Sequence, residues 1–100
     1  MALAAINVCH ELGVQPGRDL SIVGFDDLPQ GQWPLFSLTT FVQPMSQMIG
    51  RAVSIVRAQL KDPTTLAIQE VLPGRLIVRG TARVPDSGVI EQNGERIWEP

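Results

Sequence analysis

Residues 20–27 of the chain read Leu-Ser-Ile-Val-Gly-Phe-Asp-Asp, a short apolar run that ends in two carboxylates. The apolar part, residues 20–25, includes two β-branched side chains and is typical of a strand that is buried on both faces of a sheet. In α/β sheets ligands bind just beyond the carboxyl ends of the strands. Asp26 and Asp27 are therefore the first candidates for a functional site.

The segment before this strand predicts a helix and a tight turn. Apolar residues recur at helical spacing within residues 1–13, and Gly13 is suited to end a helix. Ser, Thr, Asp and Asn, the usual capping residues, are absent before the pattern, so we expect the helix to begin upstream of Met1. A turn containing Pro16 and Gly17 then leads into the strand, which gives half of a βαβ unit.

The chain beyond the two aspartates alternates between predicted loops, strands and one long helix. Residues 28–37 are predicted to form a loop and residues 38–42 a second strand. Residues 45–61 carry an amphipathic apolar stripe and form the clearest helix of the sequence. Two short strands, residues 66–72 and 75–79, are predicted on either side of a Pro-Gly turn.

The last residues, 84–100, are more polar and are predicted to form a tail that contains a hairpin. Residues 89–98 place the dipeptide Asn93-Gly94 between two short runs, a strong signal for a two-residue turn. The implied register gives two cross-strand pairs, Glu91 with Arg96 and Ile90 with Ile97.

Composition excludes several classes of function. The 100 residues carry a formal net charge of −2 without a basic face for nucleic acid, and lack an apolar run of roughly 18 residues for a membrane span. Nothing resembles a secretion leader, so we expect a cytoplasmic protein. Cys9 and His10 are adjacent and project about 100° apart on a helix, which does not suit a metal pair or a catalytic dyad. Phosphate-binding loops and nucleophile motifs are absent, so we expect neither catalysis nor a cofactor or metal.

Three segments, in this order, resemble the last third of regulators of the LacI/GalR family. They are residues 20–27, residues 38–44 (Leu-Thr-Thr-Phe-Val-Gln-Pro) and residues 75–80 (Arg-Leu-Ile-Val-Arg-Gly). The resemblance implies an α/β fold, a truncated periplasmic-binding-protein-like (type I) sensor domain in which helices flank a parallel sheet. It covers residues 1–83 as the C-terminal part of an effector-binding domain and leaves residues 84–100 as an individual tail.

The resemblance also implies that the chain crosses between two lobes. The crossings would fall near residues 43–44 and 72–74, so that helix 45–61 would belong to the other lobe. Burial of its roughly seven apolar side chains at ~1.5–3 kcal/mol each would rival the stability of a whole domain. We therefore expect this helix to fold back on the sheet or to associate with a second copy.

The resemblance assigns a ligand contact to Asp26, whose carboxylate can accept hydrogen bonds from adjacent sugar hydroxyls. From the residues alone, an aspartate that caps a turn is the alternative. Because successive side chains of a strand point to opposite faces, we expect Asp27 to be structural. Gln43 offers both a donor and an acceptor to a ligand, although a polar residue at a strand end is often only solvated.

Three apolar residues complete the predicted sites. Phe25 would present an apolar face to a sugar ring, with core or interface packing as the alternative. Trp33, in a loop, is predicted to contact the second subunit of a dimer. Leu3 matches a region that forms the subunit interface in the family, and simple packing within its lobe is equally compatible with its position.

Together these features predict the C-terminal fragment of a sugar-sensing and dimerisation domain from a LacI-type regulator. The implied partners are a sugar- or nucleoside-like effector, a second copy of the chain, and DNA reached only through a helix-turn-helix headpiece that these residues lack; a membrane partner is not expected. From this chain alone we expect no sequence-specific DNA binding and weak or absent effector binding. The alternative is the C-terminal part of a periplasmic sugar receptor of a transporter, which shares the fold.

Overall fold

The computed structural model describes residues 1–99, which form two compact units. The first unit combines residues 1–42 with the chain from Arg75 onward, and the second comprises residues 43–74. The chain thus leaves the first unit after one strand and returns to it with another. That these boundaries are crossings between two lobes, as expected near residues 43–44 and 72–74, stays a prediction.

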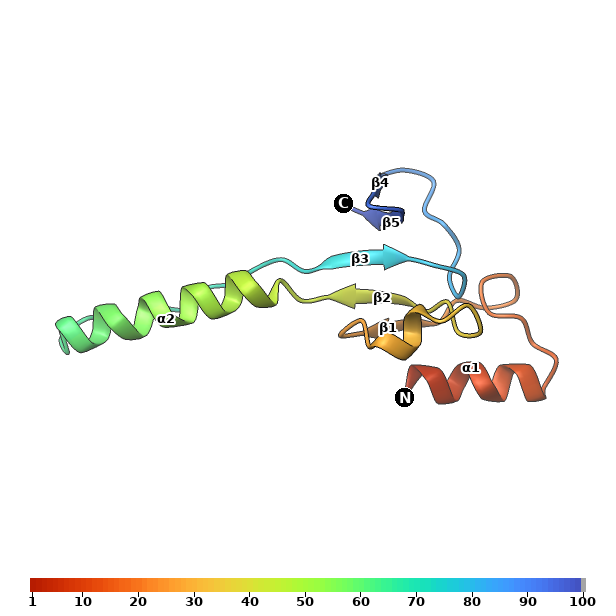
Figure 1. Ribbon diagram of the computed structural model, residues 1–100, viewed down its shortest axis with the longest axis horizontal. Coiled ribbons are helices and arrows are strands. Elements are labelled where there is room, and N and C mark those ends of the chain that lie inside the picture. Colours follow the sequence, from red (N-terminus) through yellow and green to blue (C-terminus); the bar gives the residue numbers. More distant parts are fainter. Residues whose placement is uncertain (100) are drawn as a thin grey trace. The chain divides into compact units, whose positions relative to one another are not determined.

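A mixed five-stranded sheet forms the first unit, in the order β1-β2-β3-β5-β4 (Figure 1). The strands are β1 (Val23–Phe25), β2 (Thr39–Val42), β3 (Arg75–Val78), β4 (Val89–Gln92) and β5 (Glu95–Trp98). Only the β1–β2 pair is parallel, and the other three neighbouring pairs are antiparallel. The predicted α/β class is confirmed, but the sheet is not wholly parallel, because the chain returns from the second unit in the opposite direction and then forms a hairpin.

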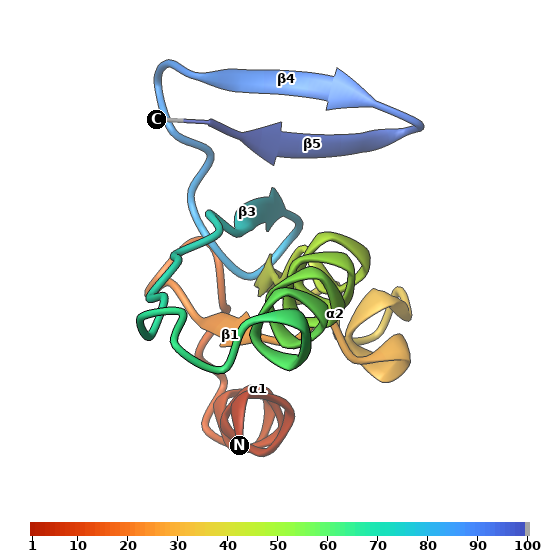
Figure 2. The ribbon, with the colours of Figure 1, turned by 90° about the vertical axis from the view of Figure 1, so that its left-hand side faces the viewer.

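Helix α1 (Ala2–Glu11) precedes the sheet and, seen end-on in Figure 2, lies next to β1. Its buried residues are Ile6 and Cys9, which share one face at a spacing of three. The last residue of the helix is Glu11, and the predicted stop follows at Gly13, which has φ +69°. The Val14 amide donates to the Cys9 carbonyl at 2.9 Å.

Strand β1 is shorter and more exposed than the sequence predicts. Residues 20–22 lie outside it, and Leu20 forms only an isolated bridge with Pro16. Val23 is 47% and Phe25 60% exposed, so the expectation of burial on both faces is wrong. The exposed residues, Val23 and Phe25, project from the same face of β1, which is an edge strand with only β2 beside it.

The core of the first unit combines aliphatic side chains with buried threonines that join the strand ends. Thr81 is 3% exposed; its hydroxyl accepts a hydrogen bond from the Thr39 amide at 2.9 Å and donates one to the Ile22 carbonyl at 2.8 Å. A buried hydroxyl with both functions satisfied links segments that are distant in sequence without leaving an unpaired polar group. The buried apolar residues are Ile6, Cys9, Leu38, Ile77, Val78 and Ile97.

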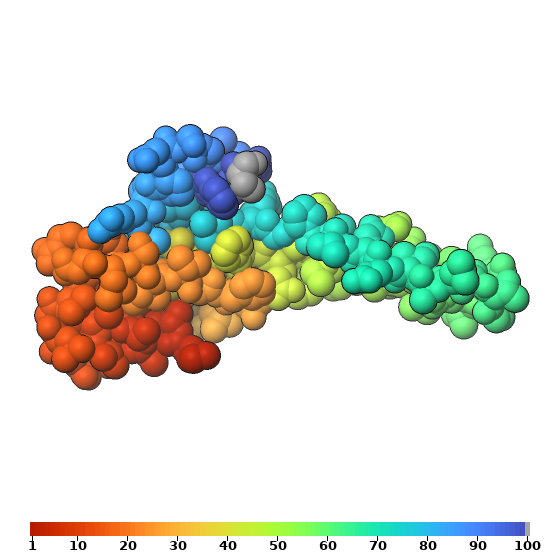
Figure 3. All heavy atoms as spheres, turned by 180° about the vertical axis from the view of Figure 1, so that it is seen from behind, coloured from red at the N-terminus to blue at the C-terminus, as the bar shows by residue number. Residues whose placement is uncertain are grey.

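The predicted hairpin is confirmed in position and in register. Its turn residues have positive φ, 53° at Asn93 and 79° at Gly94, as a two-residue type I′ turn requires. The cross-strand pairs are those expected, Glu91 with Arg96 and Ile90 with Ile97. Strand β5 also pairs with β3, so the hairpin extends the sheet, and Figure 3 shows its atoms (blue) against the rest of the first unit.

The second unit consists of helix α2 (Met45–Lys61) and the segment that follows it. No residue of α2 is buried, so its apolar stripe stays exposed. The strand predicted at residues 66–72 is wrong, because the unit contains no strand with which it could pair. The segment instead runs beside the helix, where Arg51 donates to both carboxylate oxygens of Glu70 at 2.7–3.0 Å.

Candidate ligand-binding site

The backbone turns sharply at Asp26 and Asp27, directly after β1. Both residues have positive φ, 77° and 45°, which costs on the order of 1–3 kcal/mol for a residue other than glycine. Strand β2 supports the turn: the Asp26 amide donates to the Phe41 carbonyl at 2.9 Å, and the Asp27 amide to Oγ1 of Thr40 at 3.3 Å. Strained backbone of this kind concentrates at ligand sites.

The two aspartates differ in environment. Asp26 is exposed, whereas Asp27 is half-buried and accepts hydrogen bonds from Nη1 of Arg79 at 2.7 Å and from Nε2 of Gln32 at 3.3 Å. The two carboxylates thus have different surroundings, while the ligand contact expected of Asp26 and the structural role expected of Asp27 stay predictions. The difference between the two aspartates arises from the left-handed turn and not from the alternation of side chains along a strand, because both residues lie beyond the end of β1.

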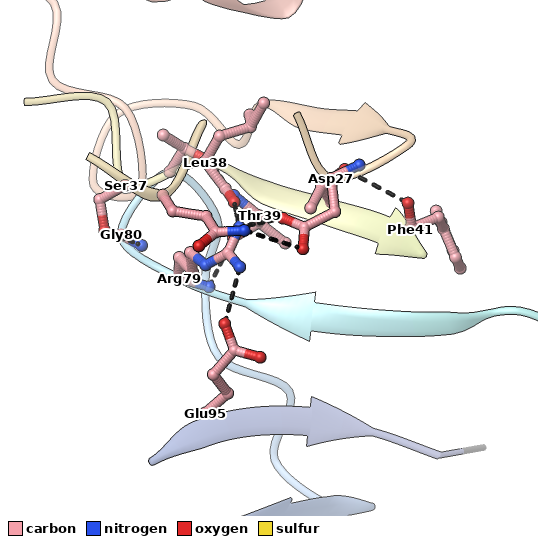
Figure 4. A network of polar contacts seen from close by, with 11 residues as sticks. Asp27, Ser37, Leu38, Thr39, Phe41, Arg79, Gly80 and Glu95 are labelled. Atoms are coloured by element: carbon pink, nitrogen blue, oxygen red, sulfur yellow. Dashed lines mark hydrogen bonds and ion pairs between the residues drawn. The ribbon is translucent and has the colours of Figure 1, made fainter. Parts of the chain in front are cut away.

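Arg79 is the centre of a polar network that joins three parts of the first unit (Figure 4). Its Nη1 donates to Asp27 and to the Leu38 carbonyl at 3.0 Å, and its Nη2 donates to Oε1 of Glu95 on the hairpin at 2.8 Å. Its own amide donates to Oγ1 of Thr39 at 2.9 Å. The guanidinium thus joins the turn after β1 to Leu38, the residue before β2, and to β5.

The electrostatic balance at Arg79 favours its charged form. Burial of the guanidinium opposes the charge, but hydrogen bonds to Asp27 and Glu95 and the negative charges of these groups raise the pKa of Arg79 above its ordinary value. The Arg79 side chain is 11% exposed, compared with 17% for Asp27 and 42% for Glu95. The Asp27 pair is therefore the better shielded of the two.

An apolar cavity of about 530 Å³ opens beside the turn, between the beginning of α1 and the sheet edge. Phe25 and Phe41 contribute their rings, which tilt at 38° to each other with centroids 6.2 Å apart. The lining residues are Met1, Ala2, Leu3, Val23, Gly24, Phe25, Leu28, Leu38 and Phe41. None of these side chains is polar, so they can shelter an apolar face but offer no side-chain group that orients hydroxyls.

Two of the predicted residues, Trp33 and Gln43, are not among those that line this cavity. Trp33 is 54% exposed in the loop after the short 3₁₀ helix η1 (Pro29–Gln32), and its ring lies 6.3 Å from that of Phe36. Gln43 is half-buried at the start of the second unit, where its carbonyl accepts a hydrogen bond from the Met45 amide at 2.8 Å. Leu3 and Phe25 are the two predicted residues that the structure brings together, as both line the cavity.

Two residues of this region were not singled out from the sequence. Phe41 lies opposite Phe25 in the β1–β2 register, which follows only from strand pairing. The only sequence signal for Arg79 is its place directly after the apolar residues Leu76, Ile77 and Val78 of a predicted strand. Which carboxylates would reach it could not be read from the sequence.

Within residues 1–99 the structure contains no group of three or more His, Cys, Asp or Glu side chains that could hold a metal ion. None of the helices in this described part is long and apolar enough to cross a membrane.

Comparison with known proteins places the matched part of the chain in one family. The family described as periplasmic binding protein-like domain matches residues 1–82. The chain is 35% identical over 86 residues to the HTH-type transcriptional regulator MalR of Streptomyces coelicolor, covering 85% of this chain and 25% of MalR. It is 30% identical over 83 residues to the ribose operon repressor of Halalkalibacterium halodurans, covering 83% of this chain and 25% of the repressor.

A solved structure shares the fold. A LacI-family transcriptional regulatory protein from Corynebacterium glutamicum superposes with a TM-score of 0.58 at 33% identity, over 82% of this chain and 32% of the regulator. The chain therefore spans about a quarter of the length of the curated relatives it matches and a third of the solved one. Hairpin β4–β5 lies beyond the residues matched by the family.

Proposed function

Since this chain belongs to the periplasmic binding protein-like domain family of LacI-type transcriptional regulators, we propose that it forms the C-terminal part of the effector-binding domain of such a regulator. The observation that carries the proposal is the strained turn after β1, which presents the exposed Asp26 next to an apolar cavity. Its role is binding and not catalysis.

The effector is a sugar- or nucleoside-like molecule that Asp26 holds through adjacent hydroxyl groups. A carboxylate accepts two such hydrogen bonds, and the apolar face of a sugar ring or base packs against an aromatic ring of the Phe25 and Phe41 pair. This division, with few polar groups for orientation and apolar groups for contact area, is typical of small-molecule sites.

The regulator acts in the cytoplasm as a dimer, with Leu3 and Trp33 at the subunit contact. It reaches DNA through a headpiece outside these residues. An effector changes the dimer only by binding one of its conformations more tightly than the other. The alternative, a sugar receptor of a transporter, is less favoured because the relatives described above are named as a transcriptional regulator and a repressor.

Titration of the ¹⁵N-labelled chain with D-ribose, maltose and uridine, followed by NMR, tests the assignment of the site. Because the chain spans about a quarter of its relatives, we expect weak binding, with Kd of about 1 mM or higher, equivalent to roughly −4 kcal/mol. The amide signals of Phe25, Asp26 and Phe41 should move in a saturable manner with at least one probe.

Two variants make the titration specific. Asp26→Ala should abolish the shifts, whereas Asp86→Ala, which removes an exposed carboxylate from the tail, should leave them unchanged. The absence of saturable shifts with all three probes, or shifts that survive Asp26→Ala, would contradict the proposal.

A further inference from the structure

The left-handed turn at Asp26 and Asp27 depends on contacts from other parts of the chain. Two consecutive non-glycine residues with positive φ are unfavourable by on the order of 1–3 kcal/mol each and persist only where surrounding groups hold them. Strand β2 holds both amides, that of Asp26 through the Phe41 carbonyl and that of Asp27 through the Thr40 hydroxyl. The only side chain of residues 1–99 that forms an ion pair with Asp27 is Arg79.

Arg79 in turn is held by a second carboxylate from the hairpin. Its Nη1 lies 2.7 Å from Oδ1 of Asp27, while its Nη2 lies 2.8 Å from Oε1 of Glu95. Glu95 is the first residue of β5, and the pairing of Val78 with Arg96 brings it beside the end of β3. The hairpin register therefore determines where the second carboxylate meets the guanidinium.

We propose that Arg79 is the positioning residue of the effector site, and that through it hairpin β4–β5 sets the conformation of the Asp26–Asp27 turn. The inference rests on the proposed function for the role of Asp26. It goes beyond that function because it makes the hairpin, which lies outside the residues matched by the family, part of the machinery that tunes the site.

The chemistry of arginine explains why this residue can join the two parts. A guanidinium is planar, stays charged and directs several N–H groups in fixed directions, so one side chain can serve Asp27, Glu95 and the Leu38 carbonyl together. A lysine ammonium would keep the charge but is a compact group that cannot span these acceptors in the same way.

The sharpest test changes the hairpin and observes the turn. Glu95→Ala removes the carboxylate that holds Arg79, and Glu91→Ala is its matched control, because it removes an exposed carboxylate from the other strand of the same hairpin. In ¹H–¹⁵N NMR spectra of the full chain without ligand, Glu95→Ala should shift the amide signals of Asp26 and Asp27. Glu91→Ala should leave both signals in place.

A conservative variant separates positioning from general loosening of the structure. Glu95→Gln keeps an oxygen that can accept from Arg79, so it should restore the Asp26 and Asp27 signals most of the way to their original positions. Arg79→Lys should also shift these signals. If Arg79→Lys fails to fold, the Glu95 variants still test the proposal, because the Glu95 side chain is more exposed than that of Arg79.

Ligand titration then distinguishes this inference from the proposed function. With whichever of D-ribose, maltose or uridine binds, Glu95→Ala should weaken binding by roughly two- to fivefold, the equivalent of the ~0.4–1 kcal/mol that a partly exposed ion pair contributes. If Glu95→Ala shifts the Asp26 and Asp27 signals but the chain binds none of the three probes, the positioning role is supported and the proposed function is contradicted. Equal effects of Glu95→Ala and Glu91→Ala on the turn, or unchanged affinity in Glu95→Ala, would overturn the positioning role.

Discussion

Replacement of Ile97 by alanine tests whether the hairpin is seated on the sheet in solution. Ile97 is 6% exposed and pairs with Ile77 of β3 on one side and Ile90 of β4 on the other. The substitution removes three carbon groups, which at about 0.8 kcal/mol each gives ~2.4 kcal/mol, and the remaining cavity raises the expected loss to about 2.5–4 kcal/mol.

Ile90→Ala is the matched control, since it makes the same chemical change one strand away in the same register. Ile90 is 45% exposed on the edge strand, so much of its side chain is already in water and the expected loss is below about 1 kcal/mol. Urea unfolding followed by tryptophan fluorescence measures both, because Trp33 and Trp98, the only tryptophans, lie in the first unit.

The contrast between the two variants decides the outcome. If Ile97→Ala leaves too little folded protein, Ile97→Val, with an expected loss of about 0.5–1.5 kcal/mol, extends the series. Losses for Ile97→Ala and Ile90→Ala that agree within ~0.5 kcal/mol would show that the hairpin does not pack on β3, and the reasoning above would be wrong.

Three further outcomes follow from the first unit. Thr81→Val should destabilise the chain by about 1–3 kcal/mol in urea unfolding, because two buried backbone groups lose their partner, whereas Thr81→Ser, which keeps the hydroxyl, should lose less. Hydrogen bonds from the Arg18 side chain and the Gln15 amide lower the pKa of the Asp19 carboxyl to about 2, so Asp19 should titrate near that value by NMR. Arg18→Ala should raise the pKa of Asp19. The contribution of the Asp19 carboxylate to stability is present above about pH 4 and is lost as the pH falls through 2. The buried Cys9 should react with a thiol reagent only slowly until urea unfolds the chain, and rapid labelling of the folded chain would contradict its burial.

Several elements were predictable because their signals are local. Gly13 and Asn93-Gly94 mark the end of a helix and the turn of a hairpin through backbone conformations that few other residues adopt, and both occur where expected. Helix α2 followed from its apolar periodicity, and its bounds, Met45–Lys61, are those predicted. The family also followed from three short segments, residues 20–27, 38–44 and 75–80, which occur in the same order as in LacI/GalR regulators.

The predictions that failed depended on partners distant in sequence. Residues 66–72 have the composition of a strand, but a strand needs a neighbour for its hydrogen bonds, and the second unit offers only a helix. Likewise β1 has the composition of a buried strand, yet it lies at a sheet edge.

The sequence by itself determined the family, the helices, the hairpin and the two aspartates as the residues to examine, because these depend on neighbours within a few positions. Only the tertiary structure decided that Arg79 joins Asp27 to Glu95, residues separated from it by 52 and 16 positions. The physical reason is that a half-buried charge takes the carboxylate that strand pairing brings within reach, and strand pairing is a property of the whole sheet.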